Sequence, residues 1–275
     1  MKLRIRRADP AGNITLFVMS KADRKDYAAI SNQLLAMEEF GAEQVGFVEY
    51  QDNGKVHMQM MGGEFCGNAT RSFGYLMSML STEKPSEVEV DVSGSAEPLK
   101  AEVDLEKGTS RTQMPLPVEI VELPKIQGET YSMVVFEGIC HIIVKSAPRE
   151  QDFVDQVIQV AEKVCPADAY GVMFLEGEKM TPVVNVKENG SMVWESSCGS
   201  GSMGAAVYLS HGKEDGTYVY ELHQPGGVIE ASVTIENGKV IQCKMGGPVV
   251  ISDEMTVEIG GKNELPGELK HAEFL

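Results

Sequence analysis

The sequence predicts an α+β fold made of two pseudo-symmetric domains, each a curved sheet around one central helix. Three observations lead to this prediction. A Cys-Gly motif occurs twice, at Cys66 and Cys198, each time just before an apolar, helix-like run. A similar pattern of strands and turns follows each motif. Short alternating segments bounded by Gly, Asn and Asp fill most of the remaining chain, as expected for sheets.

Strands are expected in short β-branched or alternating segments of both halves. They include ITLFVMS, EQVGFVEY, VHMQM and VEVDV in the first half, and HIIVKS, VVNVK, VIEASVTI and KVIQCKM in the second. Helical periodicity is present in DRKDYAAISNQLLAMEEF, in FVDQVIQVAEKVC and after each Cys-Gly motif. The runs FGYLM and GAAVYL are apolar, so the helices after the two motifs should be buried.

The second half repeats the first. The two cysteines are 132 residues apart (198 − 66), close to half of the 275-residue chain. Residues 92–117 match residues 224–248 in their order of Gly-containing turn, strand, charged Gly turn, strand, Met and Pro, and AGNITLFV faces EGICHIIV. This period is too long for a solenoid and indicates two homologous domains. We place them at 1–118 and 119–264, divided in the Pro-containing segment LPVEIVELPKIQGET, and expect the tail 265–275 to pack on the first half.

Composition excludes several function classes. A formal net charge of −17 argues against binding to nucleic acid or to an anionic membrane. The basic start MKLRIRR has no apolar stretch or cleavage site of a signal peptide, which favours a cytoplasmic protein. Five dispersed cysteines, an odd number, do not form a disulfide framework, and the absence of CxxC or HxxxH pairs predicts no metal site. Any cysteine chemistry is therefore expected to be thiol chemistry.

The two motifs have a physical interpretation as one site. Gly67 and Gly199 let the backbone approach a ligand, and Asn68 and Ser200 are the expected helix N-caps. Two helix N-termini at one site would bind a carboxylate, and their field is expected to lower the thiol pKa. One cysteine could then remove a proton from the carbon beside the carboxylate while the other delivers one from the opposite face. This reaction inverts the carbon and needs no pyridoxal cofactor.

The segments AGNITLFV, EFCGNAT, VWESSCGSGS and HQPGG, which span most of the chain, resemble the diaminopimelate epimerase-like superfamily of cofactor-independent amino-acid racemases. They are most similar to the histidine racemases of staphylopine-type opine metallophore biosynthesis. Diaminopimelate epimerases carry CGNGAR and ERGxGET, where this chain has CGNATR and a shorter VWESS without Arg. The resemblance implies a homodimer that converts L-histidine to D-histidine, a small-molecule substrate, without cofactor or metal.

The resemblance also implies roles for individual residues. Cys66 and Cys198 would be the two bases, and Glu43 and Glu195 the supporting carboxylates. Glu195 also lies three residues before Cys198, where it could relay a proton. Asn13 would bind substrate together with the first residues of both helices, Gly67, Asn68, Gly199 and Ser200. His141 aligns only roughly with a histidine of diaminopimelate epimerases and is a weaker candidate.

Other interpretations stay open at this point. The same cysteine pair could invert another amino acid, such as diaminopimelate, proline or a basic residue, or the chain could be a catalytically silent binding protein of the same fold. Glu43 and Glu195 could be ordinary surface carboxylates. The remaining cysteines, Cys140, Cys165 and Cys243, are expected to be ordinary packing residues.

Overall fold

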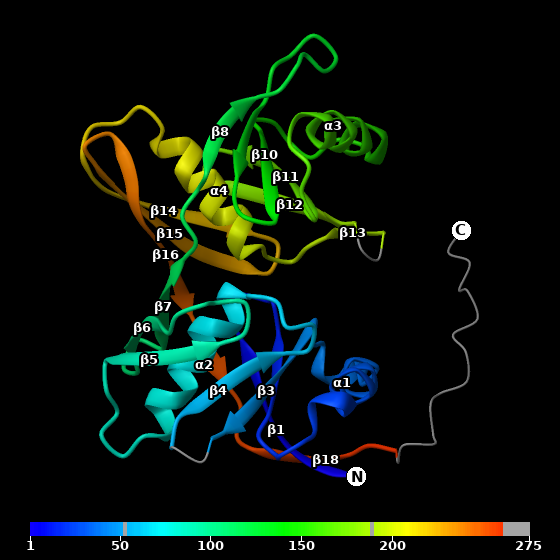
Figure 1. Cartoon of the computed structure of the whole chain (residues 1–275), viewed down its shortest axis with the longest axis vertical. Helices are drawn as coiled ribbons and strands as arrows, with labels where there is room; N and C mark the ends of the chain where they lie inside the picture. Colours follow the sequence, from blue (N-terminus) through cyan, green and yellow to red (C-terminus); the bar gives the residue numbers. More distant parts are fainter. Residues whose placement is uncertain (52–53, 188–189, 261–275) are drawn as a thin grey trace.

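The computed structural model describes residues 1–51, 54–187 and 190–260, which form two stacked lobes joined by a continuous sheet (Figure 1). The first lobe contains β1 (Lys2–Asp9), β2 (Thr15–Val18), β3 (Gln44–Tyr50), β4 (Val56–Met60), β5 (Glu87–Val92), β6 (Leu99–Asp104), β7 (Thr109–Met114), β17 (Val250–Ile251) and β18 (Met255–Glu258). The second lobe contains β8 (Glu119–Glu122), β9 (Ser132–Val135), β10 (Ile139–Val144), β11 (Ala169–Glu176), β12 (Lys179–Val186), β13 (Ser191–Trp194), β14 (Gly216–Gln224), β15 (Gly227–Glu236) and β16 (Lys239–Pro248).

The order of strand pairing is the same in both lobes. In the first lobe β1–β2 is antiparallel, β2–β3 parallel, β3–β4 antiparallel and β4–β5 parallel, and β5–β6–β7 is an antiparallel meander. The second lobe repeats these directions in β9–β10, β10–β11, β11–β12, β12–β14 and the meander β14–β15–β16. The segments matched in the sequence therefore occupy equivalent strands. The exact boundary at residues 118/119 stays a prediction.

Each lobe packs one helix against the concave side of its meander. The helices are α1 (Tyr27–Leu35), α2 (Gly67–Leu80), α3 (Gln151–Val164) and α4 (Gly199–Ser210), with 3-10 turns η1 (Arg24–Asp26) and η2 (Glu38–Phe40). Helix α2 contacts β5, β6 and β7, and α4 contacts β15, β16 and β10. Phe73 and Leu76 of α2 are fully buried, as their apolar run predicted. None of these helices in the described part of the chain is long and apolar enough to cross a membrane.

The helix predicted from DRKDYAAISNQLLAMEEF is shorter than its periodicity suggested. Only α1 is α-helical, and a 3-10 turn flanks it on each side. The backbone of Met37 leaves the helical region at φ −84° and ψ 88°, and Gly41 then takes a left-handed conformation. Helix α1 therefore ends before the acidic residues that follow it.

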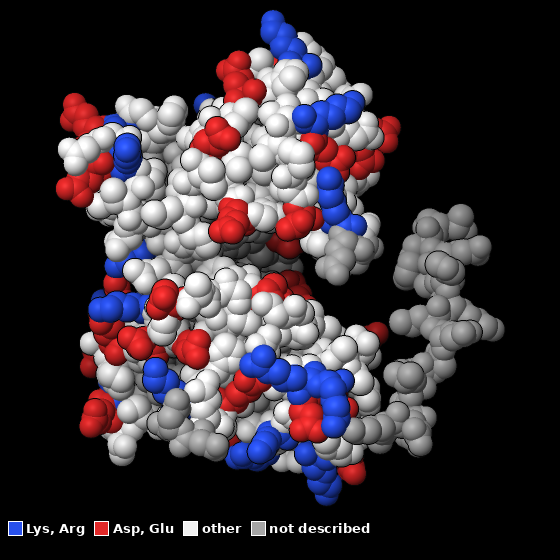
Figure 2. Space-filling model, in the orientation of Figure 1, with Lys and Arg blue, Asp and Glu red and all other residues white. Residues whose placement is uncertain are grey.

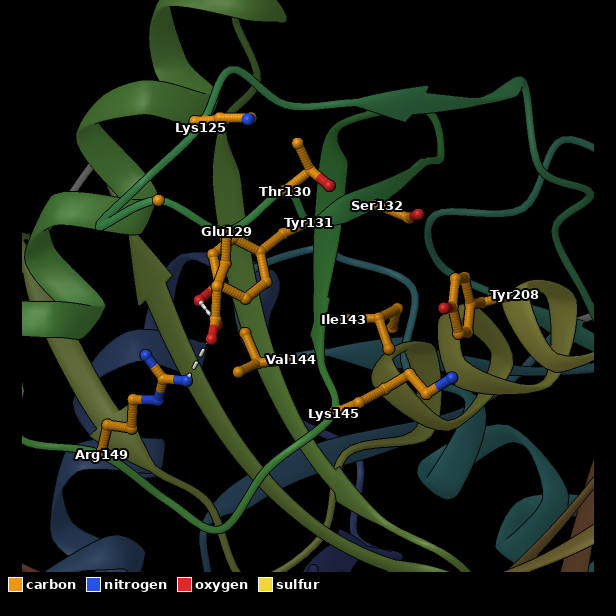
Figure 3. A pocket seen from close by; sticks show the side chains of 11 residues that line it. Lys125, Glu129, Thr130, Tyr131, Ser132, Ile143, Val144, Lys145, Arg149 and Tyr208 are labelled. Atoms are coloured by element: carbon orange, nitrogen blue, oxygen red, sulfur yellow. Dashed lines mark hydrogen bonds and ion pairs between the residues drawn. The ribbon is translucent and has the colours of Figure 1, made fainter.

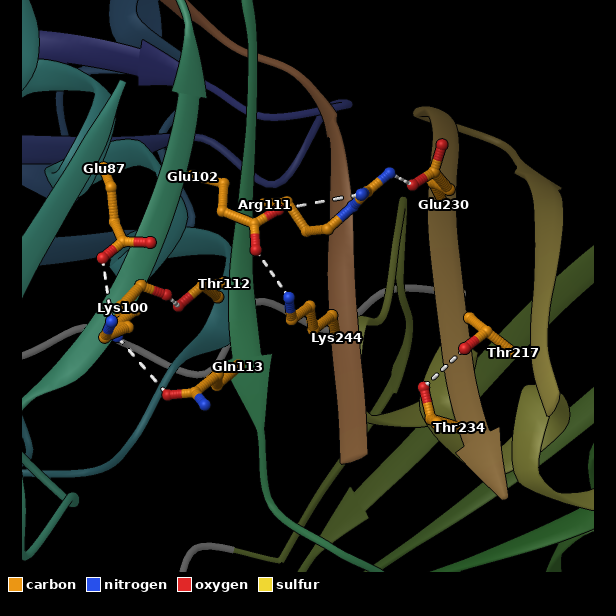
Figure 4. A network of polar contacts seen from close by, with 10 residues as sticks. All are labelled: Glu87, Lys100, Glu102, Arg111, Thr112, Gln113, Thr217, Glu230, Thr234 and Lys244. Carbon is orange, nitrogen blue, oxygen red and sulfur yellow. Dashed lines mark hydrogen bonds and ion pairs between the residues drawn. The ribbon is translucent and has the colours of Figure 1, made fainter. Parts of the chain in front are cut away.

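Strands β7 and β16 join the lobes. They pair antiparallel from Thr109↔Pro248 to Met114↔Cys243, so the sheet passes from one lobe into the other without a break. Charged side chains cross the same joint (Figure 4): Arg111 on β7 pairs with Glu230 on β15, and Lys244 on β16 donates to Glu102 on β6 at 2.5 Å. Strand pairing and ion pairs together fix how the lobes face each other.

The C-terminal part of the predicted second domain lies on the first lobe. Strands β17 and β18 pair with β1, so assigning residues 250–258 to the second half was wrong. The physical reason is that the basic start of the chain is itself a strand, whose Leu3 and Ile5 are buried in a cluster with Val257. The tail 265–275 lies outside the described residues.

Candidate active site

Each of the two predicted cysteines is the N-cap of its lobe's buried helix. Cys66 and Cys198 have nearly equal extended backbones (φ −131°, ψ 113° and φ −124°, ψ 112°), and each Sγ accepts a hydrogen bond from the amide three residues on. The hydroxyls of Thr70 and Ser202 donate to the two cysteine carbonyls at 2.7 and 2.6 Å. The N-caps expected at Asn68 and Ser200 were therefore wrong, because the sulfurs occupy the capping position themselves.

The helix N-termini approach each other around one methionine. A Cβ on Gly67 would lie 2.5 Å from the sulfur of Met245, and a Cβ on Gly199 would lie 2.8 Å from the same sulfur. The same Cβ on Gly199 would lie 4.0 Å from Nδ2 of the Asn68 side chain on the other helix. A side chain at the first position of either helix would therefore displace the Met245 side chain.

The turn that carries Asn13 bridges the lobes from the opposite side. A Cβ on Gly12 would lie 2.7 Å from the Cα of Gly226, and the Gly226 amide donates to the Ser196 carbonyl at 2.7 Å. Ala11 is buried and packs in the core of the second lobe. This contact brings Asn13 of the first lobe next to the segment that leads to Cys198. Figure 2 shows the groove between the lobes, with acidic side chains on both of its sides.

Asn13 lies at the centre of a polar network. Its Nδ2 donates to Glu43 at 2.6 Å, and its Oδ1 accepts from Gln44 at 2.8 Å and from Asn68 at 3.2 Å. The Gln44 side chain also forms a hydrogen bond with Cys66. The structure therefore brings together Asn13, Glu43, Asn68 and the first cysteine.

Glu195 contacts the second cysteine. Its carboxyl group forms a hydrogen bond with Cys198 and interacts electrostatically with Glu43. Burial, together with the charge of Glu43, raises the pKa of Glu195 to about 7. A carboxyl group with this pKa can exchange a proton with a neighbouring thiol at neutral pH.

The expected lowering of the thiol pKa was wrong for both cysteines. Burial raises the pKa of Cys66, although hydrogen bonds from the Ala69 amide and the Gln44 side chain oppose the rise. Burial and the adjacent Glu195 raise the pKa of Cys198 well above its ordinary value. Desolvation of the thiolate outweighs the helix-end amides, because no bulk water replaces the lost hydration.

Two buried glutamines in this site were missed by the sequence analysis. Gln44 donates to both Asn13 and Thr15 at 2.8 Å. Gln224 accepts from the Cys198 amide at 2.8 Å and donates to the Ser202 hydroxyl at 2.9 Å. The HQPGG segment contains Gln224, but a polar residue before a Gly-containing turn does not show which groups it will contact. The sequence therefore gave no way to place either glutamine in the site.

His141 does not reach the groove. It is fully buried beneath α4, where a Cβ on Gly204 would lie 2.9 Å from its own Cβ. Neither ring nitrogen has a hydrogen-bond partner among the described residues, and burial lowers its pKa to about 3. This neutral imidazole packs the core of the second lobe.

A cavity of about 440 Å³ opens directly beside the helix N-termini. The residues just before Cys66, Glu64 and Phe65, form one side, and Ser200 on α4 lies in its wall. Phe136 and Glu137 from the β9–β10 turn contribute another side. The cavity thus combines aromatic walls with two carboxylates.

A second hollow, of about 490 Å³, is lined by Lys125, Lys145, Arg149, Glu129 and Tyr208 among others (Figure 3). Arg149 is engaged by Glu129 at 3.1 Å, and none of the predicted site residues lines this hollow. Of the predicted site residues, Ser200 is the one that lines the cavity beside the helix N-termini.

Comparison with known proteins identifies the family. The model of the histidine racemase CntK N-terminal domain matches residues 2–257. The chain belongs to the histidine racemase family. A histidine racemase of Fusobacterium nucleatum is 32% identical over 266 residues, which cover 91% of this chain and 95% of that protein. One of Staphylococcus aureus is 30% identical over 232 residues, with coverages of 80% and 85%. As a member of the histidine racemase family, the chain is an amino-acid racemase, and thus an isomerase.

Solved structures with low sequence identity share the fold of this histidine racemase family member. A phenazine biosynthesis protein of the PhzF family from Enterococcus faecalis has 11% identity and a TM-score of 0.63, covering 94% of this chain and all of that one (100%). A hydroxyproline epimerase from Agrobacterium vitis has 10% identity and a TM-score of 0.61, with coverages of 93% and 92%. The predicted α+β class with large curved sheets is confirmed at this level.

The carboxyl group of Glu195 predicts a pH-dependent stability. Its pKa rises from the ordinary 4.5 to about 7, so the folded protein keeps a proton that the unfolded chain has lost, and stability falls as pH rises through this window. Because glutamine cannot ionise, Glu195→Gln should be more stable than the parent by on the order of 2 kcal/mol at about pH 8. The difference should vanish below the ordinary pKa. Urea unfolding at a series of pH values measures it, with exposed Glu176→Gln as the control. Parallel profiles of Glu195→Gln and parent would contradict this assignment.

Proposed function

We propose that this protein interconverts L-histidine and D-histidine by a two-base reaction of Cys66 and Cys198, without a cofactor. One observation carries the proposal: both sulfurs cap the N-termini of equivalent helices that meet at the same groove. The names of the relatives support histidine as the substrate. Retention of both cysteines at matched positions favours catalysis over a silent binding role.

Inversion requires one thiolate and one thiol. The thiolate takes the proton from Cα, the C–H electron pair moves into the carbon and its carboxylate, and the thiol S–H breaks to form a new C–H bond on the opposite face. The product is the other enantiomer, and the two cysteines have exchanged protonation. Positions on opposite sides of one carbon allow each enantiomer to be deprotonated by a different cysteine.

The helix N-termini would bind the substrate carboxylate. The first-turn amides of Gly67, Gly199 and Ser200 are not used by the helices themselves, whereas the Asn68 amide forms a hydrogen bond with Cys66. They converge on the groove, and a carboxylate there would gain charge as Cα is deprotonated. Fixed amide dipoles stabilise that growing charge without reorganisation.

Of the two carboxylates, Glu43 would bind the substrate ammonium group and Glu195 would transfer protons. Glu43 is held by Asn13 at 2.6 Å, which leaves a carboxylate oriented at the groove for the α-ammonium group. Glu195, with a pKa of about 7 and a hydrogen bond to Cys198, can return a proton to that sulfur after turnover. An ordinary surface role would not explain why Glu43 contacts Asn13 or why Glu195 contacts Cys198.

The cavity beside Cys66 fits the substrate side chain. Phe65 and Phe136 offer flat apolar walls for an imidazole ring, and Glu64 and Glu137 can accept hydrogen bonds from its N–H groups. These carboxylates would favour a basic side chain over an acidic one, which distinguishes histidine from diaminopimelate, whose distal end carries a carboxylate.

We also propose a use for the product, a compartment and an oligomeric state. The D-histidine product would be a substrate for metallophore assembly. The enzyme would act in the cytoplasm as a homodimer. The similarity to histidine racemases over most of the chain supports this setting.

Replacing either cysteine should abolish inversion. Cys66→Ala and Cys198→Ala each remove one of two essential proton carriers, so turnover should fall by roughly 10²–10⁴-fold or more. Loss of the α-proton signal of L-histidine in D₂O, followed by chiral chromatography, measures exchange and inversion separately.

The control for the cysteine variants is Cys165→Ala, which changes a half-buried thiol outside the groove and should leave turnover intact. Near-normal turnover in either site variant would refute the two-base scheme. Exchange with another amino acid but not histidine would overturn the substrate, and silence across an amino-acid panel would favour the binding-protein alternative.

The cavity carboxylates should affect substrate affinity more than turnover. Both Glu64 and Glu137 are exposed, so each contact is worth about 0.2–1 kcal/mol, and Glu64→Gln or Glu137→Gln should raise the KM for histidine about 1.5–5-fold. The double variant should show the product of both effects, with kcat nearly unchanged. Steady-state kinetics at low salt measure this, and an unchanged KM in the double variant would exclude the cavity as the side-chain site.

The assembly can be tested directly. We expect a mass close to twice 29.9 kDa by size-exclusion chromatography with light scattering at micromolar concentration. A monomeric mass would contradict the homodimer and leave the chemical proposal intact.

A further inference from the structure

A chain of side-chain hydrogen bonds runs from the interior of α2 to the groove. Nε of Arg71 donates to Oδ1 of Asn68 at 3.2 Å, and Nδ2 of Asn68 donates to Oδ1 of Asn13 at 3.2 Å. Nδ2 of Asn13 then donates to the carboxylate of Glu43 at 2.6 Å. A fully buried arginine and an exposed carboxylate are therefore connected through two side-chain amides.

The buried end of this chain is firmly held. Nη1 of Arg71 donates to the carbonyls of Gly247 and Pro248, both at 3.0 Å, at the end of β16. No carboxylate of the described residues forms an ion pair with this guanidinium. Burial lowers the pKa of Arg71 to about 10, so the group still carries its charge at neutral pH. Arg71 is thus a donor whose position is set by the backbone of β16.

The two ends of the chain decide the direction of both amides. A guanidinium has only donors, and a carboxylate has only acceptors. Asn68 must therefore present its oxygen to Arg71, which leaves its nitrogen for Asn13. Asn13 in turn must present its oxygen to Asn68 and its nitrogen to Glu43. A flip of either amide would place two donors or two acceptors against each other.

The two amides differ in how much support they receive. The oxygen of Asn13 also accepts a hydrogen bond from Gln44 at 2.8 Å, which favours the same direction. Among the described residues, the Asn68 side chain forms hydrogen bonds with Arg71 and Asn13. Asn68 is only 3% exposed, so removal of the guanidinium would leave its oxygen buried without a donor. The orientation of Asn68 therefore depends on Arg71.

The second lobe shows that helix packing alone does not require the arginine. With the 132-residue offset (198 − 66), Arg71 corresponds to Met203 in α4, and Asn68 corresponds to Ser200. Met203 is 1% exposed and fills its place with apolar atoms. The hydroxyl of Ser200 lies 3.6 Å from the sulfur of Cys198, and a hydroxyl can rotate to suit its partner. The buried cation thus occurs in the helix that carries an amide to be oriented.

We propose that Arg71 is a positioning residue that, through Asn68 and Asn13, holds Glu43 in the orientation that binds the substrate α-ammonium group. This inference rests on the proposed function, in which Glu43 receives that ammonium. Arg71 itself touches no substrate. Its contribution to binding is therefore limited to ligands that carry an ammonium group on the carbon beside the carboxylate.

Two ligands that differ in this one group test the proposal. Isothermal titration compares 3-(imidazol-4-yl)propionate, which lacks the ammonium, with racemic histidine, whose composition turnover does not change. The parent should bind histidine more tightly. Arg71→Met should weaken histidine binding by roughly 2–12-fold, the worth of one buried hydrogen bond, and change propionate binding little. An equal loss for both ligands, or no loss for histidine, would overturn the proposal.

Further variants separate positioning from packing. Arg71→Lys keeps a cationic donor and should retain most of the preference for histidine, whereas Arg71→Gln can also accept and should lose it. The control is Arg24→Met, which removes an arginine whose side chain is 64% exposed and should affect neither ligand. If thermal unfolding shows that Arg71→Met does not fold, the contrast between Arg71→Gln and Arg71→Lys decides. Equal preferences in these two variants would then refute the role of Arg71.

Side-chain amide exchange gives an answer without any ligand. In protein labelled with ¹⁵N-asparagine, the NH₂ signals of Asn13 are identified by their loss in Asn13→Asp. Their exchange with D₂O should be roughly 2–12-fold faster in Arg71→Met than in the parent. Unchanged exchange in a folded Arg71→Met variant would contradict the positioning role. A parent that binds neither ligand would instead refute histidine as the substrate, and the exchange rates would still decide on Arg71.

Discussion

Burial of two sulfurs at the N-termini of two helices is the constraint on which the rest of this structure depends. Gly67 and Gly199 leave room for the sulfur of Met245 between the two helices. Burial of this region raises the pKa of both thiols. The same approach directs first-turn amides of both helices to one place. The arrangement that we propose as an anion site therefore makes a thiolate costly.

The surrounding polar groups can be understood as compensation for that cost. Gln44 and Gln224 satisfy buried groups next to the two cysteines, and Asn13 links Glu43 to the first helix. The Gln44 hydrogen bond lowers the pKa of Cys66, but burial outweighs this effect.

The fold supplies the frame for this site without specifying its chemistry. Proteins described as a phenazine biosynthesis protein and as a hydroxyproline epimerase share the same fold at 10–11% identity. What differs between such proteins must lie in side chains at the groove. Here the continuous sheet through β7 and β16, together with the contact of Gly12 with Gly226, fixes the two lobes at a spacing at which their side chains interact.

The sequence by itself determined the duplication, most strands, the two buried helices and the pair of cysteines, because these depend on local patterns and on a fixed spacing of identical motifs. It also indicated Glu43, Glu195 and Asn13 through family resemblance. Only the tertiary structure decided which atoms cap the helices, that β17 and β18 return to β1, and that Arg71 reaches carbonyls 176 residues away. It also reversed the expected direction of the thiol pKa. Local sequence shows the helix amides that favour a thiolate, whereas the desolvation that opposes it arises from residues that come together only in the folded chain.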